Sequence, residues 1–298
     1  MLLYRTYRAF LTRKFGMPVL RIPVNAGFSC PNRDGAISTA GCAFCDNRSF
    51  SPAAIAEDPA IDQLRAAMRR ARGYGAFIAY LQPFTNTYGT VDRLRSAFEP
   101  LMAEPGVVGL AAGTRPDCLP SEVCDYLADV NRRTYLCMEL GLQSGNDATL
   151  LRINRGHSVA DFIHAVDELH TRGIETAAHV ILGLPGEDRG MMLSTARLLA
   201  SLPVAGVKIH QLMIIKGTAL ESEYREGRIS VLSLDEYAGI LADFLACLRP
   251  DQLVHRVVAE SSRETGLIAP AWSADKTAAI AQIHRVLGSR EIKELQSR

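Results

Sequence analysis

Short apolar runs rich in β-branched and aromatic residues alternate with longer amphipathic stretches along most of this chain. The runs have the length and composition of buried strands, whereas the stretches repeat their apolar positions at the period of a helix. We therefore expect strands at residues 19–24, 77–82, 107–112, 135–142, 176–182 and 207–215. We expect helices at residues 61–72, 91–102, 121–130, 159–172 and 190–202.

This order of elements makes six consecutive strand–helix units, and the strands are almost continuously apolar. Such strands are typical of a parallel sheet covered by helices, either open and doubly wound or closed into a barrel. A complete barrel of eight units takes roughly 250 residues. Because only six units occupy residues 1–250 here, we expect an α/β fold of the partial (β/α)6 TIM-barrel type.

The domain organisation follows from the same pattern. We expect residues 1–250 to form one domain and residues 251–298 to form a C-terminal extension that packs on the barrel. The extension contains a predicted strand at residues 253–259, a loop with Trp272 and a predicted helix at residues 276–287. The sequence has no long repeat, low-complexity tract or Gly/Ser-rich linker that would divide it further.

Composition and charge are those of an ordinary globular protein, with 298 residues, 48% hydrophobic, 22% charged and a net charge of +1. Such a small net charge gives no overall field toward nucleic acid or an anionic membrane. An N-terminal basic arm nevertheless contains five basic residues and no acidic one, namely Arg5, Arg8, Arg13, Lys14 and Arg21. This arm is either a solvated helix or a basic lip for a phosphate-bearing substrate.

The sequence carries no sign of a membrane segment or a secretion signal. No apolar run reaches the ~18 residues that a membrane-spanning helix needs. The first residues also lack the apolar core and cleavage site of a signal peptide. We therefore expect a cytoplasmic protein with no membrane partner, in which the seven cysteines are metal ligands or core residues and not disulfides.

Polar or unusual residues follow the predicted strands at the point where each strand ends. The first strand leads to Cys30 and the second to Gln82, while Glu139, His179 and His210 lie on later strands. The carboxyl ends of parallel strands meet on one side of the fold, where ligands bind. We therefore expect these side chains to share one pocket.

Three of the cysteines lie close together in the sequence. Cys30 is followed by eleven residues and Cys42, and then by two residues and Cys45. A structural zinc wants four ligands, and no histidine lies near this loop. An iron–sulfur cluster held by three cysteines instead leaves one iron open. The pair Cys42 and Cys45 alone would indicate redox-active thiols or zinc as readily as a cluster, but the third cysteine at a strand end, together with Phe44, favours a cluster.

The cysteine loop resembles that of the radical S-adenosylmethionine (SAM) superfamily, with Cys-Pro-Asn-Arg-Asp-Gly before Gly-Cys-Ala-Phe-Cys. It is most similar to the small bacterial YhcC-type family, which is similar in turn to the radical domain of the Elongator catalytic subunit. Further matches follow in the expected order at residues 82–88, 113–120, 139–144, 154–157, 179–187 and 208–218.

The resemblance implies a radical SAM enzyme. Cys30, Cys42 and Cys45 would hold a [4Fe–4S] cluster whose open iron binds the amino and carboxylate groups of SAM. Reductive cleavage would give a 5′-deoxyadenosyl radical that abstracts hydrogen from a substrate. The partners implied are an electron donor such as flavodoxin or ferredoxin and an unidentified substrate, for which tRNA is one candidate.

The resemblance also implies which residues bind the cofactor. Phe44 matches an aromatic position near the adenine, and Gly183 lies where the backbone approaches the adenine closely. Gln143 and Arg155 match residues that bind the ribose and the methionine carboxylate, although Arg155 could instead cap a helix.

Three of the candidate positions differ from the superfamily's usual residues, and a fourth could have a purely structural role. Gln82 and Asn86 stand where the superfamily usually has a Gly-Gly-Glu stretch. His179 replaces an Asp that is found in porphyrinogen-oxidising relatives. Glu139 is assigned to cofactor binding, with an ion pair to a helix Lys or Arg as the alternative.

His210 is the candidate catalytic residue. Because side chains alternate along a strand, we expect only one of Lys208 and His210 to face the barrel interior, and we choose His210. Two other functions stay open. A zinc- or cluster-stabilised module could bind nucleic acid without catalysis. An ordinary methyltransferase is disfavoured, because its first strand should end in a Gly-rich loop and not in Cys30.

Overall fold

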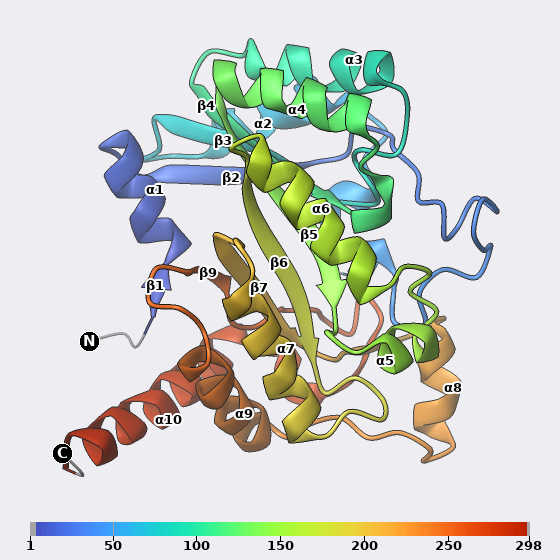
Figure 1. The fold of residues 1–298 in the computed structure, drawn as a ribbon, viewed down its shortest axis with the longest axis vertical. Coiled ribbons are helices and arrows are strands. Elements are labelled where there is room, and N and C mark those ends of the chain that lie inside the picture. The colour runs from blue at the N-terminus through green and yellow to red at the C-terminus, as the bar shows by residue number, and fades with distance from the viewer. Residues whose placement is uncertain (1–3, 50, 297–298) are drawn as a thin grey trace.

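The computed structural model describes residues 4–49 and 51–296, which form a curled parallel sheet with helices on its outer face (Figure 1). The sheet has eight strands in the order β1-β9-β7-β6-β5-β4-β3-β2, and every neighbouring pair is parallel. The bounds are β1 (Arg5–Thr6), β2 (Val19–Val24), β3 (Ala76–Leu81), β4 (Val107–Thr114), β5 (Tyr135–Gln143), β6 (Glu175–Leu182), β7 (Gly206–Gln211) and β9 (Leu253–Arg256). Since β1 and β2 are the two edges of this sheet, the barrel is open between them, and the expected partial α/β barrel is confirmed.

Six of the eight strands are those expected from the apolar pattern. The sheet is wider than six strands because β9, expected in the C-terminal extension, pairs with β7, and the short β1 pairs with β9. The sixth expected strand is also shorter than predicted, because β7 ends at Gln211. The chain then forms β8 (Ile214–Ile215), which pairs antiparallel with β10 (Leu267–Ala269) in a separate small sheet.

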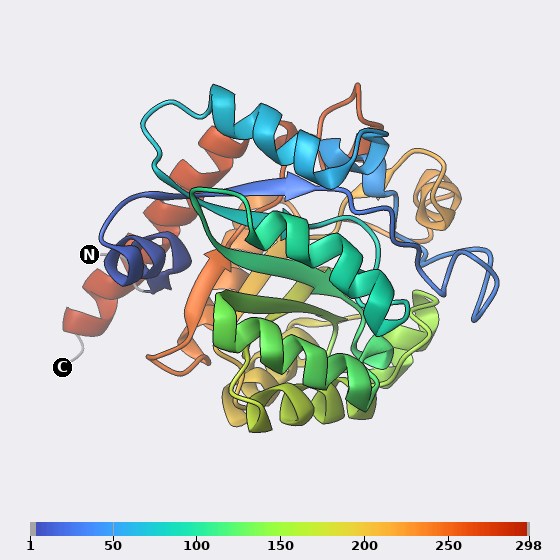
Figure 2. The same cartoon turned by 90° about the horizontal axis from the view of Figure 1, so that it is seen from above.

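The five expected helices cover the outer face of the sheet (Figure 2). They are α2 (Ala60–Arg70), α3 (Val91–Met102), α4 (Ser121–Arg133), α6 (Val159–Thr171) and α7 (Arg189–Ser201). Each buries apolar side chains toward the strands, as Phe98 of α3 and Phe162 of α6 illustrate. With helices outside and side chains filling the interior, every residue of β3 is buried, which is typical of parallel sheets.

The sequence pattern missed three helices, α5 (Asp147–Arg152), α8 (Ala219–Arg225) and α9 (Leu234–Ala246). Helix α9 begins at a capping box, in which the Ser233 hydroxyl accepts from the Glu236 backbone N–H and the Glu236 carboxylate accepts from Ser233. That Ser-x-x-Glu signal before an apolar run was readable in the sequence. The last helix, α10 (Lys276–Gln296), packs along α9.

The division into residues 1–250 and 251–298 stays a prediction, and the first three and last two residues of those ranges lie outside the described residues. No helix among the described residues is long and apolar enough to cross a membrane.

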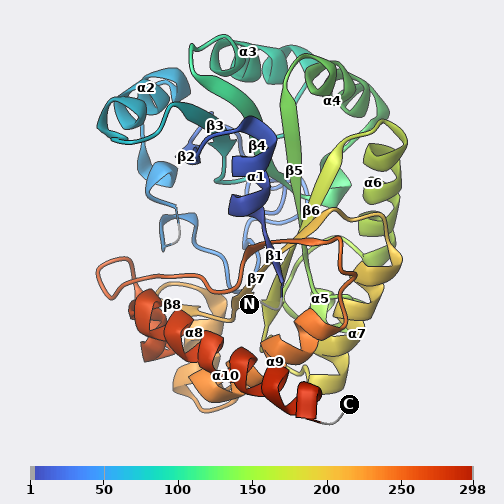
Figure 3. The same cartoon turned by 90° about the vertical axis from the view of Figure 1, so that its left-hand side faces the viewer.

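The N-terminal segment forms helix α1 (Tyr7–Phe15), which lies across the amino-terminal end of the barrel (Figure 3). Its buried Tyr7 and Leu11 pack with Ile78 and other inward-facing strand residues, and the Tyr7 ring stacks on His255 with centroids 3.7 Å apart. The basic side chains of α1 are exposed at this end, away from the cysteine loop. Arg21, the last basic residue of the arm, instead points into the barrel and pairs with Glu139.

Candidate active site

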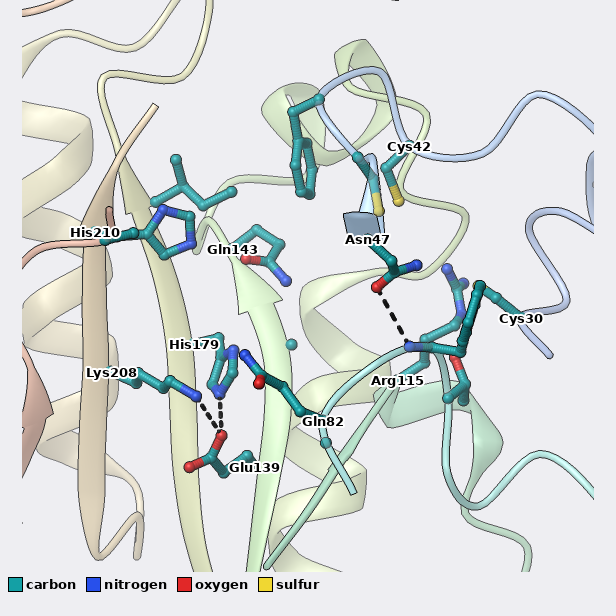
Figure 4. Close-up of a pocket in the computed structure, with 18 of the residues that line it drawn as sticks. Cys30, Cys42, Asn47, Gln82, Arg115, Glu139, Gln143, His179, Lys208 and His210 are labelled. Carbon is teal, nitrogen blue, oxygen red and sulfur yellow. Dashed lines mark hydrogen bonds and ion pairs between the residues drawn. The ribbon is translucent and has the colours of Figure 1, made fainter. Parts of the chain in front are cut away.

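A cavity opens at the carboxyl ends of the strands, with about 1140 Å³ of empty space in the cavity and its mouth. Ten of the twelve predicted site residues line it, namely Cys30, Cys42, Phe44, Cys45, Gln82, Glu139, Gln143, Arg155, His179 and His210. Figure 4 shows Cys30 and Cys42 at one end of this cavity and Glu139, Lys208 and His210 at the other. The cavity therefore brings together residues that lie up to 180 positions apart in the sequence.

The cysteine loop between β2 and α2 is irregular but firmly attached to the rest of the fold. The Ala43 N–H donates to the Ile153 carbonyl at 2.9 Å, and the Leu220 N–H donates to the Ala43 carbonyl at 3.1 Å. Within the loop, the Arg33 N–H donates to the Cys30 carbonyl at 2.8 Å. The loop is thus held between the elements that follow β5 and β8.

The thiol of Cys42 lies among N–H donors. Asn32 Nδ2 and Arg155 Nη1 each lie 3.4 Å from Cys42 Sγ, and Asn32 is fully buried. Nearby, Asn154 Nδ2 donates to the Gly41 carbonyl at 2.7 Å, which fixes the loop just before the thiol. N–H donors around the sulfurs stabilise a negatively charged ligand set, as at iron–sulfur clusters.

Burial, together with the neighbouring thiols of Cys42 and Cys30, raises the pKa of Cys45 to about 11 against the lowering effect of Arg33. In the metal-free chain this thiol is therefore protonated at neutral pH. A bound metal would have to displace the proton, which is the usual consequence of metal ligation.

The three free thiols of Cys30, Cys42 and Cys45 line the same cavity. The cysteines of an iron–sulfur cluster each bind a different iron, whereas a structural zinc takes four ligands. The donor set of Cys30, Cys42 and Cys45 thus fits a cluster with one open iron.

Glu139 is the centre of a buried ionic network at the inner end of the cavity. Its Oε1 pairs with Arg21 and lies 3.5 Å from His255 Nδ1. Its Oε2 accepts from the Tyr80 hydroxyl at 2.5 Å and lies 2.7 Å from both Lys208 Nζ and His179 Nε2. These neighbours hold the pKa of Glu139 well below its usual range, despite complete burial. The alternative of an ion pair with a helix Lys or Arg does not apply, because its cationic partners Arg21 and Lys208 lie on the strands β2 and β7.

Burial lowers the pKa of His179 to about 3 and that of His255 to about 4, so both imidazoles are neutral at pH 7. It also lowers the pKa of Lys208 to about 7, helped by the nearby Arg256 and Arg21 and opposed by Glu139. Burial also lowers the pKa of His210 well below 6.5, and the positive charge of Arg256 lowers it further, so this imidazole is neutral as well.

The expectation that only one of Lys208 and His210 faces the interior is wrong. Both line the cavity. Side chains alternate between the two faces of a strand at successive residues, so residues two apart point the same way.

Asn86 and Gly183 lie outside the lining of the cavity. The Asn86 amide donates to the carbonyls of Leu81, Pro83 and Gly113 at 2.9 to 3.0 Å, so it fixes the turn after β3. Gly183 has a φ of +86°, and a Cβ there would meet Leu232 at 3.0 Å. Its conformation therefore serves the turn after β6.

Residues that the sequence did not single out also line the cavity, among them Tyr80, Phe84, Arg115 and Arg256. Backbone strain marks the same region. Phe84, Gln143 and Asn154 are the non-glycine residues of the described chain with positive φ, at +63°, +75° and +51°. Such strain tends to collect at functional sites, but no sequence pattern reports it for Phe or Gln.

Comparison with known proteins decides the family. The sequence profile of the Radical SAM superfamily matches residues 30–199, more than half of the chain and including the cysteine loop. The chain belongs to the Radical SAM superfamily. A second profile, of the Radical_SAM C-terminal domain, matches residues 204–288 of this radical SAM protein. Proteins of the superfamily bind a [4Fe–4S] cluster and SAM.

Curated relatives cover almost the whole radical SAM chain. The uncharacterized protein YtqA of Bacillus subtilis is 40% identical over 291 residues, which are 96% of this chain and 90% of the relative. Protein YhcC of Escherichia coli is 34% identical over 284 residues, which are 95% of this chain and 92% of that protein. The tRNA uridine(34) acetyltransferase of Dehalococcoides mccartyi is 30% identical over 159 residues, 52% of this chain and 34% of that protein. The resemblance to the YhcC-type family is confirmed.

Among solved structures, Elp3 of Methanocaldococcus infernus with an N-terminal deletion superposes with a TM-score of 0.59. The match covers 82% of this radical SAM chain and 60% of that one at 16% identity. At this identity the similarity establishes the fold, a partial barrel shared with radical SAM proteins.

Proposed function

We propose that this protein is an enzyme that cleaves SAM reductively at a cluster held by Cys30, Cys42 and Cys45. The observation that carries the proposal is the set of three free thiols at the mouth of one cavity, with N–H donors around Cys42. When bound, the cluster and SAM supply an electron and a 5′-deoxyadenosyl radical that takes hydrogen from a C–H bond of the substrate. The chain supplies position, charge and exclusion of water.

Arg155 is proposed to orient the methionine end of SAM. Its guanidinium is buried, contacts Cys42 Sγ and donates to the Gly141 carbonyl at 2.8 Å. A guanidinium fixed beside a cluster ligand is placed for a carboxylate that also binds the open iron. A side chain at Gly141 would collide with Arg155 Nη2 at 2.6 Å, so this close packing depends on glycine.

Phe44, Gln82, Gln143 and His179 are proposed to contact the rest of the cofactor, since all four line the cavity. Gln143 is held at a positive φ of +75° at the end of β5. Asn86 and Gly183 would act on the cofactor indirectly, by shaping the turns after β3 and β6.

His210 is proposed as a proton acceptor. With Nδ1–H donating to the Gln211 carbonyl at 2.9 Å, the neutral ring leaves Nε2 as the free acceptor. A substrate that loses a hydrogen atom to the radical often has to lose a proton as well, and a neutral imidazole in the cavity could receive it.

The substrate and the electron donor belong to the proposal too. An electron donor such as flavodoxin or ferredoxin would reduce the cluster. The partial match to a tRNA uridine(34) acetyltransferase supports tRNA as one candidate substrate.

The test is anaerobic cluster reconstitution and reduction with dithionite, followed by chromatographic detection of 5′-deoxyadenosine after SAM is added. We expect product from the wild type and none from Cys42→Ala. Cys247→Ala, which removes a cysteine outside the cavity, should behave as the wild type. Absence of product from all three proteins, together with tightly bound zinc, would favour the alternative of a non-catalytic nucleic-acid-binding module.

A further inference from the structure

The inner end of the cavity carries more positive than negative charge. Of the residues that the structure describes, Glu139 is the one acidic residue that lines the cavity. Around it lie the guanidiniums of Arg21 and Arg256, which are never deprotonated in proteins, and the amine of Lys208. Two permanent positive charges therefore face one negative charge, even when Lys208 is left out of the count.

Glu139 is already paired with other groups. Its Oε1 pairs with Arg21, and its Oε2 pairs with Tyr80, His179 and Lys208. The remaining positive charge is that of Arg256.

Arg256 has no hydrogen-bond or ion-pair partner among the described residues, and its Nε is buried. Burial lowers the pKa of Arg256, and the positive charge of Arg21 adds to that effect. The residue as a whole is only partly buried, but a guanidinium with a buried Nε and no direct counter-charge still costs stability, so a neutral residue here would suit the fold alone better.

The pairing of the strands places the Arg256 side chain on the cavity wall, next to Lys208. Arg256 of β9 is the pairing partner of Lys208 on β7, which is the partner of His179 on β6. Partners in register point to the same face of a parallel sheet, and all three line the cavity. The row thus presents a guanidinium, an amine and a neutral imidazole to whatever occupies the inner end.

We propose that the substrate carries an anionic group, a carboxylate or a phosphate, which binds Arg256 with Lys208 beside it. The proposal rests on the proposed function, because it assumes that the substrate enters the same cavity as SAM. A planar guanidinium next to an amine matches the geometry of an oxyanion, which it can bind with two parallel N–H bonds. The bound anion would also neutralise the excess charge that the protein leaves unpaired.

The carboxylate of SAM itself does not account for Arg256. The charged groups that act on the cysteine thiols are Arg33, Arg115 and Arg155, at the cluster end of the cavity. Arg256 instead acts on Tyr80, His179, Lys208 and His210 at the other end. Figure 4 shows the separation of the two ends, with Cys30 and Cys42 far across the cavity from Lys208 and His210.

The test is calorimetric titration of the cluster-loaded, SAM-bound protein with inorganic phosphate and, separately, with acetate, at constant ionic strength. We expect saturable one-to-one binding of at least one anion. Arg256→Gln should weaken it by about tenfold or more, as expected for a charge-assisted bidentate contact. Arg256→Lys keeps the positive charge but cannot make two parallel N–H bonds, so its affinity for the anion should lie between those of the wild type and Arg256→Gln. It replaces the glutamine variant in the test if that variant does not fold. Arg263→Gln, an exposed arginine nearby, should bind as the wild type.

Tighter binding of phosphate would identify a phosphate-bearing substrate, and tighter binding of acetate a carboxylate-bearing one. The proposal fails if neither anion saturates the wild type or if Arg256→Gln binds as tightly as the wild type. It also fails if that variant loses affinity for SAM and not for the anion. The formation of 5′-deoxyadenosine is measured separately, so a failure of SAM cleavage is not mistaken for a failure of anion binding.

Discussion

Glu139 shows how one side chain organises a whole region of the protein. It was predicted as a cofactor ligand because it lies on a strand of the predicted barrel, in a stretch that resembles the family, and the structure places it in the cavity wall. Its contacts, however, go to Arg21, Lys208 and Tyr80, none of which lies near it in the sequence. Sequence can predict that a carboxylate faces the interior, but the partners depend on which strands become neighbours, and that is a property of the folded sheet.

Replacing Glu139 by Gln should destabilise the protein strongly, because it leaves the buried Arg21 and Lys208 without a counter-charge. We expect a loss of about 3–5 kcal/mol in the free energy of unfolding. Urea denaturation of both proteins at equal cluster content would measure it. Glu57→Gln, at an exposed position, should change it by no more than about 0.5 kcal/mol. If Glu139→Gln lost no more stability than Glu57→Gln, that result would contradict the network described here.

The buried histidines predict that stability falls with acid. His179 and His255 have folded-state pKa values of about 3 and about 4, below the ordinary value of 6.5. The unfolded chain therefore binds more protons than the folded one once the pH drops below 6.5, and each histidine then favours unfolding. We expect a loss of ~2 kcal/mol per histidine between pH 7 and pH 5.

Denaturation curves at several pH values would check this. His255→Gln should flatten the dependence on pH, whereas His170→Gln, at an exposed position, should leave it as it is. Stability that does not change between pH 7 and pH 5 would show that these imidazoles are not held neutral by burial.

At the scale of elements, the apolar pattern was a good guide wherever a segment repeats one simple period. The strands β2 to β7 and their helices follow from it. It also predicted the strand β9, but not its place in the main sheet, because pairing with β7 joins segments that the sequence separates by two helices. The short β8 and β10 have too few residues to show a period.

Helix α1 covers the amino-terminal end of the barrel, and we predict that its packing there stabilises the fold. Leu11 is 2% exposed and packs among inward-facing strand residues, so Leu11→Ala should cost about 2–5 kcal/mol in the free energy of unfolding. Thr12→Ala, on the exposed side of the same helix, is the matched control. Chemical denaturation of the two variants compares them. If the two variants lose the same amount, α1 does not pack in the barrel.

At the scale of the whole molecule, the barrel gathers two sets of residues into one cavity, the thiols at its mouth and a cationic row at its inner end. The three cysteines and most of the candidate site were predictable, because ligand spacing and strand ends are visible in a sequence. Arg256 and Tyr80 were not, since nothing local distinguishes them from other buried residues of a strand. Their importance appears only when charges and register are known.

The central claim, a cluster with one open iron held by Cys30, Cys42 and Cys45, is tested most directly by electron paramagnetic resonance. The reduced, reconstituted protein should give the signal of a [4Fe–4S] cluster that changes shape when SAM is added, because SAM binds the open iron. Cys42→Ala should lack this response and Cys247→Ala should keep it. A wild-type protein that contains zinc and no iron, or whose cluster signal is the same with and without SAM, would contradict the account.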